Sequence, residues 1–250
     1  NIYTLLPNQK GTIHDIKVSG NHEVQDCPEE QIAALLYSSG TTGKPKGIML
    51  THGNIGSNAH ALKEAWQFKS DDCLLHALPI YHVHGLFVAL GCALLSGSKV
   101  LWLDAFNPDE VIDALPNCTV MMGVPTYYTR LLSNEKLQKE VVKNIRIFIS
   151  GSAPLLEETF DEFYLRTGHE IIERYGMTET NIISSNPVNG ERKSGTVGAC
   201  LPGQTLRIVD DGQNILGPND FGNIQVKGPN VFYGYWNLPD KTKEDFSKDG

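Results

Sequence analysis

IRIFISGSAPLLEETFDEFYLRTGHEIIERYG, from Ile145 to Gly176, contains the repeating pattern of this chain in its clearest form. An apolar, β-branched run (IRIFIS) comes first, and a Gly-Ser-Ala-Pro turn follows it. PLLEETFDEFYLRTG then has a helical pattern, and EIIERYG is a second apolar run. The order strand, helix, strand is typical of the units from which parallel sheets are built.

The same alternation extends upstream to about residue 31. Runs typical of strands occupy residues 32–39, 47–52, 73–79, 99–104 and 119–125, and helical patterns occupy residues 54–66 (with Asn54 as the expected cap), 82–96, 107–115 and 126–144. After about residue 195 the pattern changes to short strands, TLRIVD, NIQVKG and VFYGYW, separated by Gly, Pro and Asn turns. We therefore expect an α/β fold with a mostly parallel sheet and flanking helices, followed by a smaller antiparallel β module.

The composition is that of an ordinary globular protein, with 40% hydrophobic and 20% charged residues among 250. The net charge of −8 argues against general affinity for nucleic acid or for an anionic membrane. No run approaches the roughly 18 apolar residues of a membrane span, and no basic-then-apolar secretory pattern begins the chain. Five scattered cysteines without a CxxC pair favour free thiols in a reducing compartment. We expect a cytoplasmic protein, with an organelle matrix as the alternative.

The segment YSSGTTGKPKG, from Tyr37 to Gly47, combines three glycines, four Ser and Thr hydroxyls and two lysines. Such a loop can present backbone amides, hydroxyls and positive charge together to a polyphosphate. It is not a Walker P-loop, because Ser38 stands at the first glycine position and Pro45 follows Lys44 where a Ser or Thr is needed. A flexible surface hairpin is the alternative interpretation.

This segment closely resembles the phosphate-binding signature of the adenylate-forming enzymes, which include acyl-CoA synthetases, luciferases and peptide synthetase adenylation domains. The resemblance implies that the loop grips the phosphates of ATP, with Lys46 in a catalytic role. The matching nucleotide-binding positions are Ser38, Ser39, Gly40, Thr41, Thr42 and Gly43.

Three further segments resemble motifs of the same family. In YGMTET the resemblance implies that Tyr175 lies against adenine, with Gly176 and Met177 beside it, that Thr178 contacts phosphate, and that Glu179 holds Mg²⁺. A hard carboxylate oxygen suits that ion. SGSAPL matches the segment lining the nucleotide and acyl pocket, at Gly151, Ser152, Ala153 and Pro154. In PIYHVHG the resemblance implies that His82 lies beside the acyl group, whereas a packed structural histidine is the alternative.

In detail the chain resembles malonyl-CoA synthetases most, through ALPIYHVHGLFVA, MGVPTYYTRLL and ERYGMTETNIISSNP. A dicarboxylic acid brings a second negative charge into the pocket, and an arginine fork can bind it through two bonds. The resemblance implies this role for Arg130 and Arg174. An exposed helix position is the alternative for Arg130, and a structural role for Arg174.

The resemblance implies an enzyme that adenylates a carboxylic acid, here malonate, with ATP and Mg²⁺ and passes the acyl group to coenzyme A. An adenylation domain that feeds a carrier protein and a non-catalytic nucleotide-binding fragment stay open. We expect residues 1–30 to be the tail of a preceding subdomain, 31–195 the nucleotide- and acyl-binding core, and 196–250 the start of a β-rich subdomain. The family's C-terminal domain with its catalytic lysine is expected to be absent, so that this chain alone is weakly active or inactive.

Overall fold

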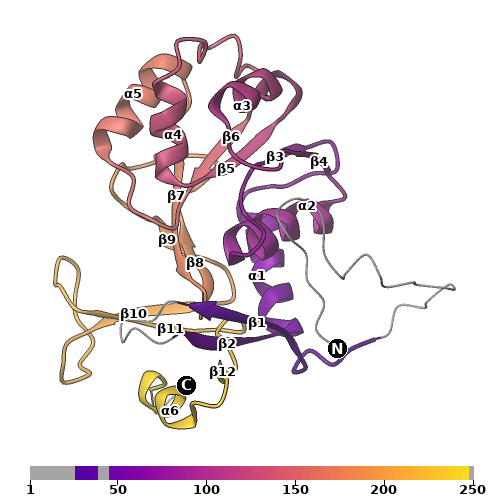
Figure 1. Cartoon of the computed structure of the whole chain (residues 1–250). Helices are drawn as coiled ribbons and strands as arrows, with labels where there is room; N and C mark the ends of the chain where they lie inside the picture. The colour runs from indigo at the N-terminus through magenta and orange to yellow at the C-terminus, as the bar shows by residue number, and fades with distance from the viewer. Residues whose placement is uncertain (1–25, 39–44, 248–250) are drawn as a thin grey trace, which may run out of the picture.

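A computed structural model describes residues 26–38 and 45–247 of the chain (Figure 1). Its largest sheet has seven strands in the order β4-β3-β5-β6-β7-β8-β9. The first five in this order pair in parallel, and β8 and β9 pair antiparallel at the end. Their bounds are β3 Cys73–His76, β4 Lys99–Trp102, β5 Val120–Gly123, β6 Ile147–Ser150, β7 Ile172–Met177, β8 Asn181–Ser185 and β9 Ala199–Cys200. The predicted α/β fold with a mostly parallel sheet is confirmed.

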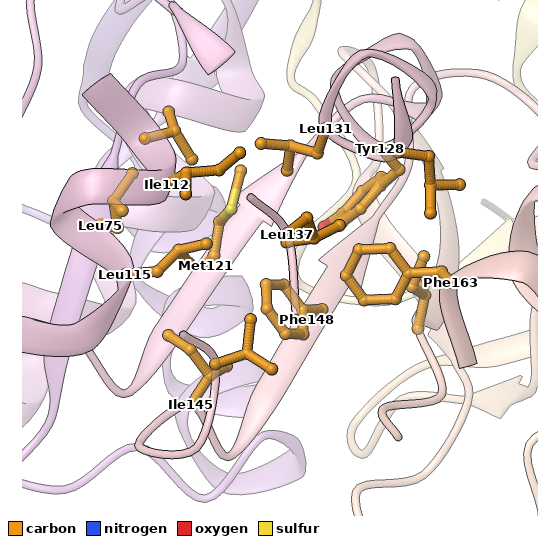
Figure 2. Packing of buried hydrophobic residues seen from close by; sticks show 14 of the residues in the cluster. Leu75, Ile112, Leu115, Met121, Tyr128, Leu131, Leu137, Ile145, Phe148 and Phe163 are labelled. Carbon is orange, nitrogen blue, oxygen red and sulfur yellow. The ribbon is translucent and has the colours of Figure 1, made fainter. Parts of the chain in front are cut away.

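Helices cover both faces of this sheet, because successive side chains of a strand point to opposite faces. On one face, Met121 and Phe148 pack under α3 (Pro108–Ala114), α4 (Pro125–Leu132) and α5 (Glu157–Thr167), as Figure 2 shows. On the other face, Met122 and Ile149 pack under α1 (His52–Ala65), a π-helical turn η2 (His84–Ala89) and α2 (Leu90–Ser96). Burial on both faces explains why the parallel strands are short, continuous apolar runs.

A second sheet contains the hairpin of β1 (Ile32–Ser38) and β2 (Lys46–Thr51), with β12 (Gly234–Tyr235) paired antiparallel to β2. Figure 1 shows it beneath the seven-stranded sheet, and α1 connects the two. This sheet therefore joins segments from both sides of the predicted boundary near residue 195, and the domain bounds stay a prediction. The strands β10 (Thr205–Val209) and β11 (Asn223–Lys227) form a separate antiparallel pair.

Three local expectations are corrected by the structure. Helix α1 is capped by Thr51, and Asn54 is its reciprocal partner three residues later. The helical pattern of residues 126–144 yields α4 only as far as Leu132, and turns follow. A short helix, α6 (Pro239–Asp245), lies in the part expected to be only β-rich, where Pro239 favours a helix start. No helix among the described residues is long and apolar enough to cross a membrane.

Candidate functional site

A cavity of about 460 Å³ opens at the carboxyl ends of the parallel strands. Segments that follow β3, β5 and β6 line it, together with η2 and the hairpin of β7 and β8. Ligands of open α/β sheets commonly bind at this edge, where the chain leaves successive strands. The cavity brings together seven of the residues singled out in the sequence, namely His82, Ser152, Arg174, Gly176, Met177, Thr178 and Glu179.

Arg174 contributes a buried positive charge to this cavity. Its side chain comes from β7 and the residue is only 5% exposed. Its Nη2 lies 3.5 Å from Ser152 Oγ, while its Nε has no hydrogen-bond partner. Burial lowers the pKa of Arg174 to about 10, so that it still carries its charge at neutral pH. Gly151 leaves room for it, because a Cβ there would lie 2.4 Å from the guanidinium carbon and would displace the side chain.

His84 lies beside Arg174, although sequence reasoning gave it no role. Its Nδ1 is 3.3 Å from Ser152 Oγ, and its Nε2 is buried without a partner. The pKa of His84 is held well below its ordinary value, mainly by burial and secondly by the positive charge of Arg174, so the imidazole is neutral. A histidine within an apolar helix looks the same in sequence whether it is packed in a core or faces a cavity.

The hairpin turn between β7 and β8 presents Thr178 and Glu179. Backbone bonding from Thr180 N to Met177 O closes this turn. Glu179 is 8% exposed, and its Oε1 accepts a hydrogen bond of 3.0 Å from the Tyr235 hydroxyl. Glu179 and Met177 also line a second cavity of about 380 Å³, which contains Tyr175 and Tyr235 as well. The two cavities therefore meet at this turn.

The donor set at the turn fits a magnesium ion bound together with phosphates. Mg²⁺ in phosphate sites is usually held by one or two carboxylates, with phosphate oxygens and waters as its other ligands. Glu179 supplies one carboxylate at the cavity. The described residues contain no group of three or more His, Cys, Asp and Glu side chains that could hold an ion alone. In such a site, phosphate oxygens of the substrate would have to supply the ligands that these side chains do not.

Other predicted site residues lie outside the first cavity or outside the described part of the chain. Ser38 ends β1 and pairs with Lys46 at the start of β2, and this is the last pair of the hairpin that the structure describes. The loop residues Ser39, Gly40, Thr41, Thr42 and Gly43 are not among the described residues. Ala153 and Pro154 are exposed in the turn after β6 and do not line the cavity.

Arg130 also lies outside the cavity lining. It is exposed on α4, with its guanidinium 4.9 Å from the centre of the Phe106 ring. Phe106 in turn stacks on Tyr127, with 3.8 Å between ring centres. This placement agrees with the alternative of an exposed helix residue, and a substrate role for Arg130 stays a prediction.

Comparison with known proteins gives a consistent result. The chain matches the AMP-binding enzyme family over residues 3–236. It is 42% identical to a malonate–CoA ligase of Arabidopsis thaliana over 241 residues, which are 87% of this chain and 39% of that protein. The ATP-bound structure of MatB from Rhodopseudomonas palustris superimposes with a TM-score of 0.95 at 49% identity, covering 99% of this chain and 50% of MatB.

A malonyl-CoA ligase solved as a ternary product complex with methylmalonyl-CoA and AMP is 38% identical, with a TM-score of 0.85 over 92% of this chain and 51% of that one. The chain thus spans about half the length, or less, of the relatives it matches. Because the family match covers most of the chain and agrees with the fold, this chain belongs to the AMP-binding enzyme family.

Proposed function

We propose that this chain is the nucleotide- and acyl-binding part of an AMP-forming ligase that joins malonate to coenzyme A. Its membership of the AMP-binding enzymes supports the reaction class. The relatives described as malonate–CoA ligases and the complex with methylmalonyl-CoA support a short dicarboxylic acid and coenzyme A. The ATP-bound neighbour supports ATP as the second substrate.

The observation that carries the choice of acid is the unneutralised charge of Arg174 in the cavity. No ion pair found among the described residues includes it, and its Nε is buried without a partner. A buried charge without a counter-ion costs several kcal/mol. An anionic group of the substrate would remove this cost. Malonate can provide one, because its second carboxylate stays free and charged when the first one reacts. The neutral His84 beside Arg174 offers a further hydrogen-bonding group without adding charge.

The reaction proposed has two steps. A carboxylate oxygen of the acid attacks the α-phosphorus of ATP, the bond to the β-phosphate oxygen breaks, and pyrophosphate leaves. The thiolate of coenzyme A then attacks the acyl carbon of the acyl-adenylate, and AMP leaves. The proposed roles of the chain are to position the substrates and to offset charge, with Lys46 near the phosphates and Glu179 toward the cation. Bound Mg²⁺ would supply electrostatic shielding of the phosphate oxygens.

The test is pyrophosphate release by the protein that carries this chain, offered malonate, methylmalonate, acetate and octanoate in turn. We expect release with malonate to exceed release with acetate and octanoate by far. Faster release with acetate or octanoate would retain the reaction class and refute the dicarboxylate pocket. If no acid causes release, the chain is a nucleotide-binding module without this activity.

A further inference from the structure

Tyr235 on β12 touches both of the elements to which phosphate chemistry is assigned above. The residue is 4% exposed. Its hydroxyl lies 3.0 Å from Glu179 Oε1 on the hairpin of β7 and β8. Its ring lies under the Lys46 ammonium, with Nζ 4.6 Å from the ring centre. Lys46 begins β2, and β12 pairs with β2 so that Tyr235 stands opposite Ile48. Tyr235 thus connects the hairpin of β1 and β2 with the turn that carries Glu179.

The segment before Tyr235 fixes the same turn through its backbone and side chains. Phe232 N donates to Glu179 O at 2.8 Å, and Asn230 Nδ2 donates to Thr180 O at 2.6 Å. Asn54 Nδ2, near the start of α1, donates to the carbonyl oxygens of residues 229 and 231 at 2.7 and 2.8 Å. Because these bonds restrain the backbone of the turn, the remaining freedom of Glu179 lies in its side chain, where the Tyr235 hydroxyl acts.

The Tyr235 hydroxyl has one proton and two acceptors. Its second acceptor is Asp245 Oδ2 on α6, also at 3.0 Å. A tyrosine hydroxyl ordinarily keeps its proton at neutral pH, so it can donate to a carboxylate. The charge of Asp245 is already balanced by Lys241, whose Nζ lies 2.9 Å from Oδ1. The single proton can be donated to Glu179 or to Asp245, and the pairing with Lys241 makes Asp245 the acceptor that needs it less.

We propose that Tyr235 is a positioning residue, which orients the Glu179 carboxylate toward a divalent cation and steers the Lys46 ammonium toward the phosphates of ATP. This inference rests on the proposed function. A hydrogen bond from a neighbouring donor fixes the direction of a ligating carboxylate, and loss of such a partner typically weakens metal affinity or activity about 10- to 100-fold. The ring contact with Lys46 is separable from this effect, because it needs the aromatic face and not the hydroxyl.

Titration calorimetry of ATP binding to the protein that carries this chain, with no acid present, separates the two contributions. Each variant is measured once with Mn²⁺, an oxygen-preferring stand-in for Mg²⁺, and once with a chelator. The dissociation constant in the chelator, divided by the dissociation constant with Mn²⁺, gives the factor by which the cation strengthens ATP binding. We expect Tyr235→Phe to reduce this ratio about tenfold while affinity without metal changes less than about twofold. Tyr235→Leu should weaken binding in the chelator as well, because it also removes the ring beneath Lys46.

Two controls keep the inference falsifiable. Tyr233→Phe makes the same chemical change two residues away, at a side chain that is 63% exposed, and should leave the ratio unchanged. Asp245→Asn removes the competing carboxylate but retains the bond to Glu179, and should also leave it unchanged. The inference is overturned if the ratio for Tyr235→Phe equals that of the unmodified protein. It is also overturned if Asp245→Asn reduces the ratio as much as Tyr235→Phe does. If the unmodified chain binds no ATP with Mn²⁺, the proposed function fails together with it.

Discussion

Replacing Arg174 with leucine separates the stability of the protein from its use of malonate. In the structure this guanidinium is 5% exposed, and its one side-chain hydrogen bond in the described part of the chain is a long one, 3.5 Å to Ser152. Removing it deletes a desolvated charge that no acidic side chain compensates. Apolar replacement of buried charged groups is often neutral or stabilising. We therefore expect the unfolding midpoint of Arg174→Leu to stay the same or rise.

The effect on malonate should be of opposite sign and large. Loss of one partner from a buried, hydrogen-bonded charge pair costs about 2–5 kcal/mol in binding. At about 1.4 kcal/mol per tenfold change, kcat/KM for malonate should fall about 30-fold or more. The dissociation constant for ATP should change less than about threefold, since this charge is assigned to the acid. Acetate, which lacks the second carboxylate, should lose little.

The assay is continuous detection of pyrophosphate with malonate and acetate, alongside calorimetric unfolding and ATP titration. Arg130→Leu provides a matched comparison, because Arg130 is exposed and lies outside the cavity lining. Equal losses for malonate and acetate in Arg174→Leu would show a structural role for the residue and refute the reasoning. Unchanged malonate kinetics in both variants would remove both arginines from the acid site.

Three further predictions concern the surroundings of the site. Gly151→Ala should fold, but its Cβ would lie 2.4 Å from the Arg174 guanidinium carbon and would displace this group. The variant should therefore lower kcat/KM for malonate as Arg174→Leu does, and malonate kinetics like those of the unmodified protein would contradict this. Arg146→Leu should lower the free energy of unfolding, measured in urea, by about 3 kcal/mol, because the buried Asp72 carboxylate would lose its ion-pair partner at 2.7 Å. A loss below about 1 kcal/mol, the value typical of surface pairs, would show that solvent replaces the lost partner. Burial lowers the pKa of His76 to about 4, so that between about pH 6.5 and pH 4 the unfolded chain binds a proton at this residue that the folded chain does not. As the solution is acidified through this window, His76 should lower the free energy of unfolding by about 1.4 kcal/mol per pH unit, and His76→Phe should reduce the slope by that amount; an unchanged slope would contradict this.

The family and the type of fold could be predicted because both depend on local sequence. Glycines, hydroxyls and lysines within a few positions of one another define YSSGTTGKPKG, and the alternation of short apolar runs with helical patterns defines the parallel sheet. The strand predicted at EIIERYG became β7, with Arg174 and Tyr175 in it. Periodicity also fails locally, as in residues 133–144, where a helical pattern forms turns instead. The functional roles of the site residues stay predictions.

By itself, the sequence determined the residue types available for the chemistry and the elements that carry them. Only the tertiary structure decided which of them meet. It places His84 beside Arg174 and leaves Arg130 on the surface, a distinction that no helical pattern contains. It also brings Tyr235 to Glu179 across 56 positions of sequence. The physical reason is that strand and helix propensities act over a few neighbouring residues, whereas these contacts depend on strand order and packing of the whole chain.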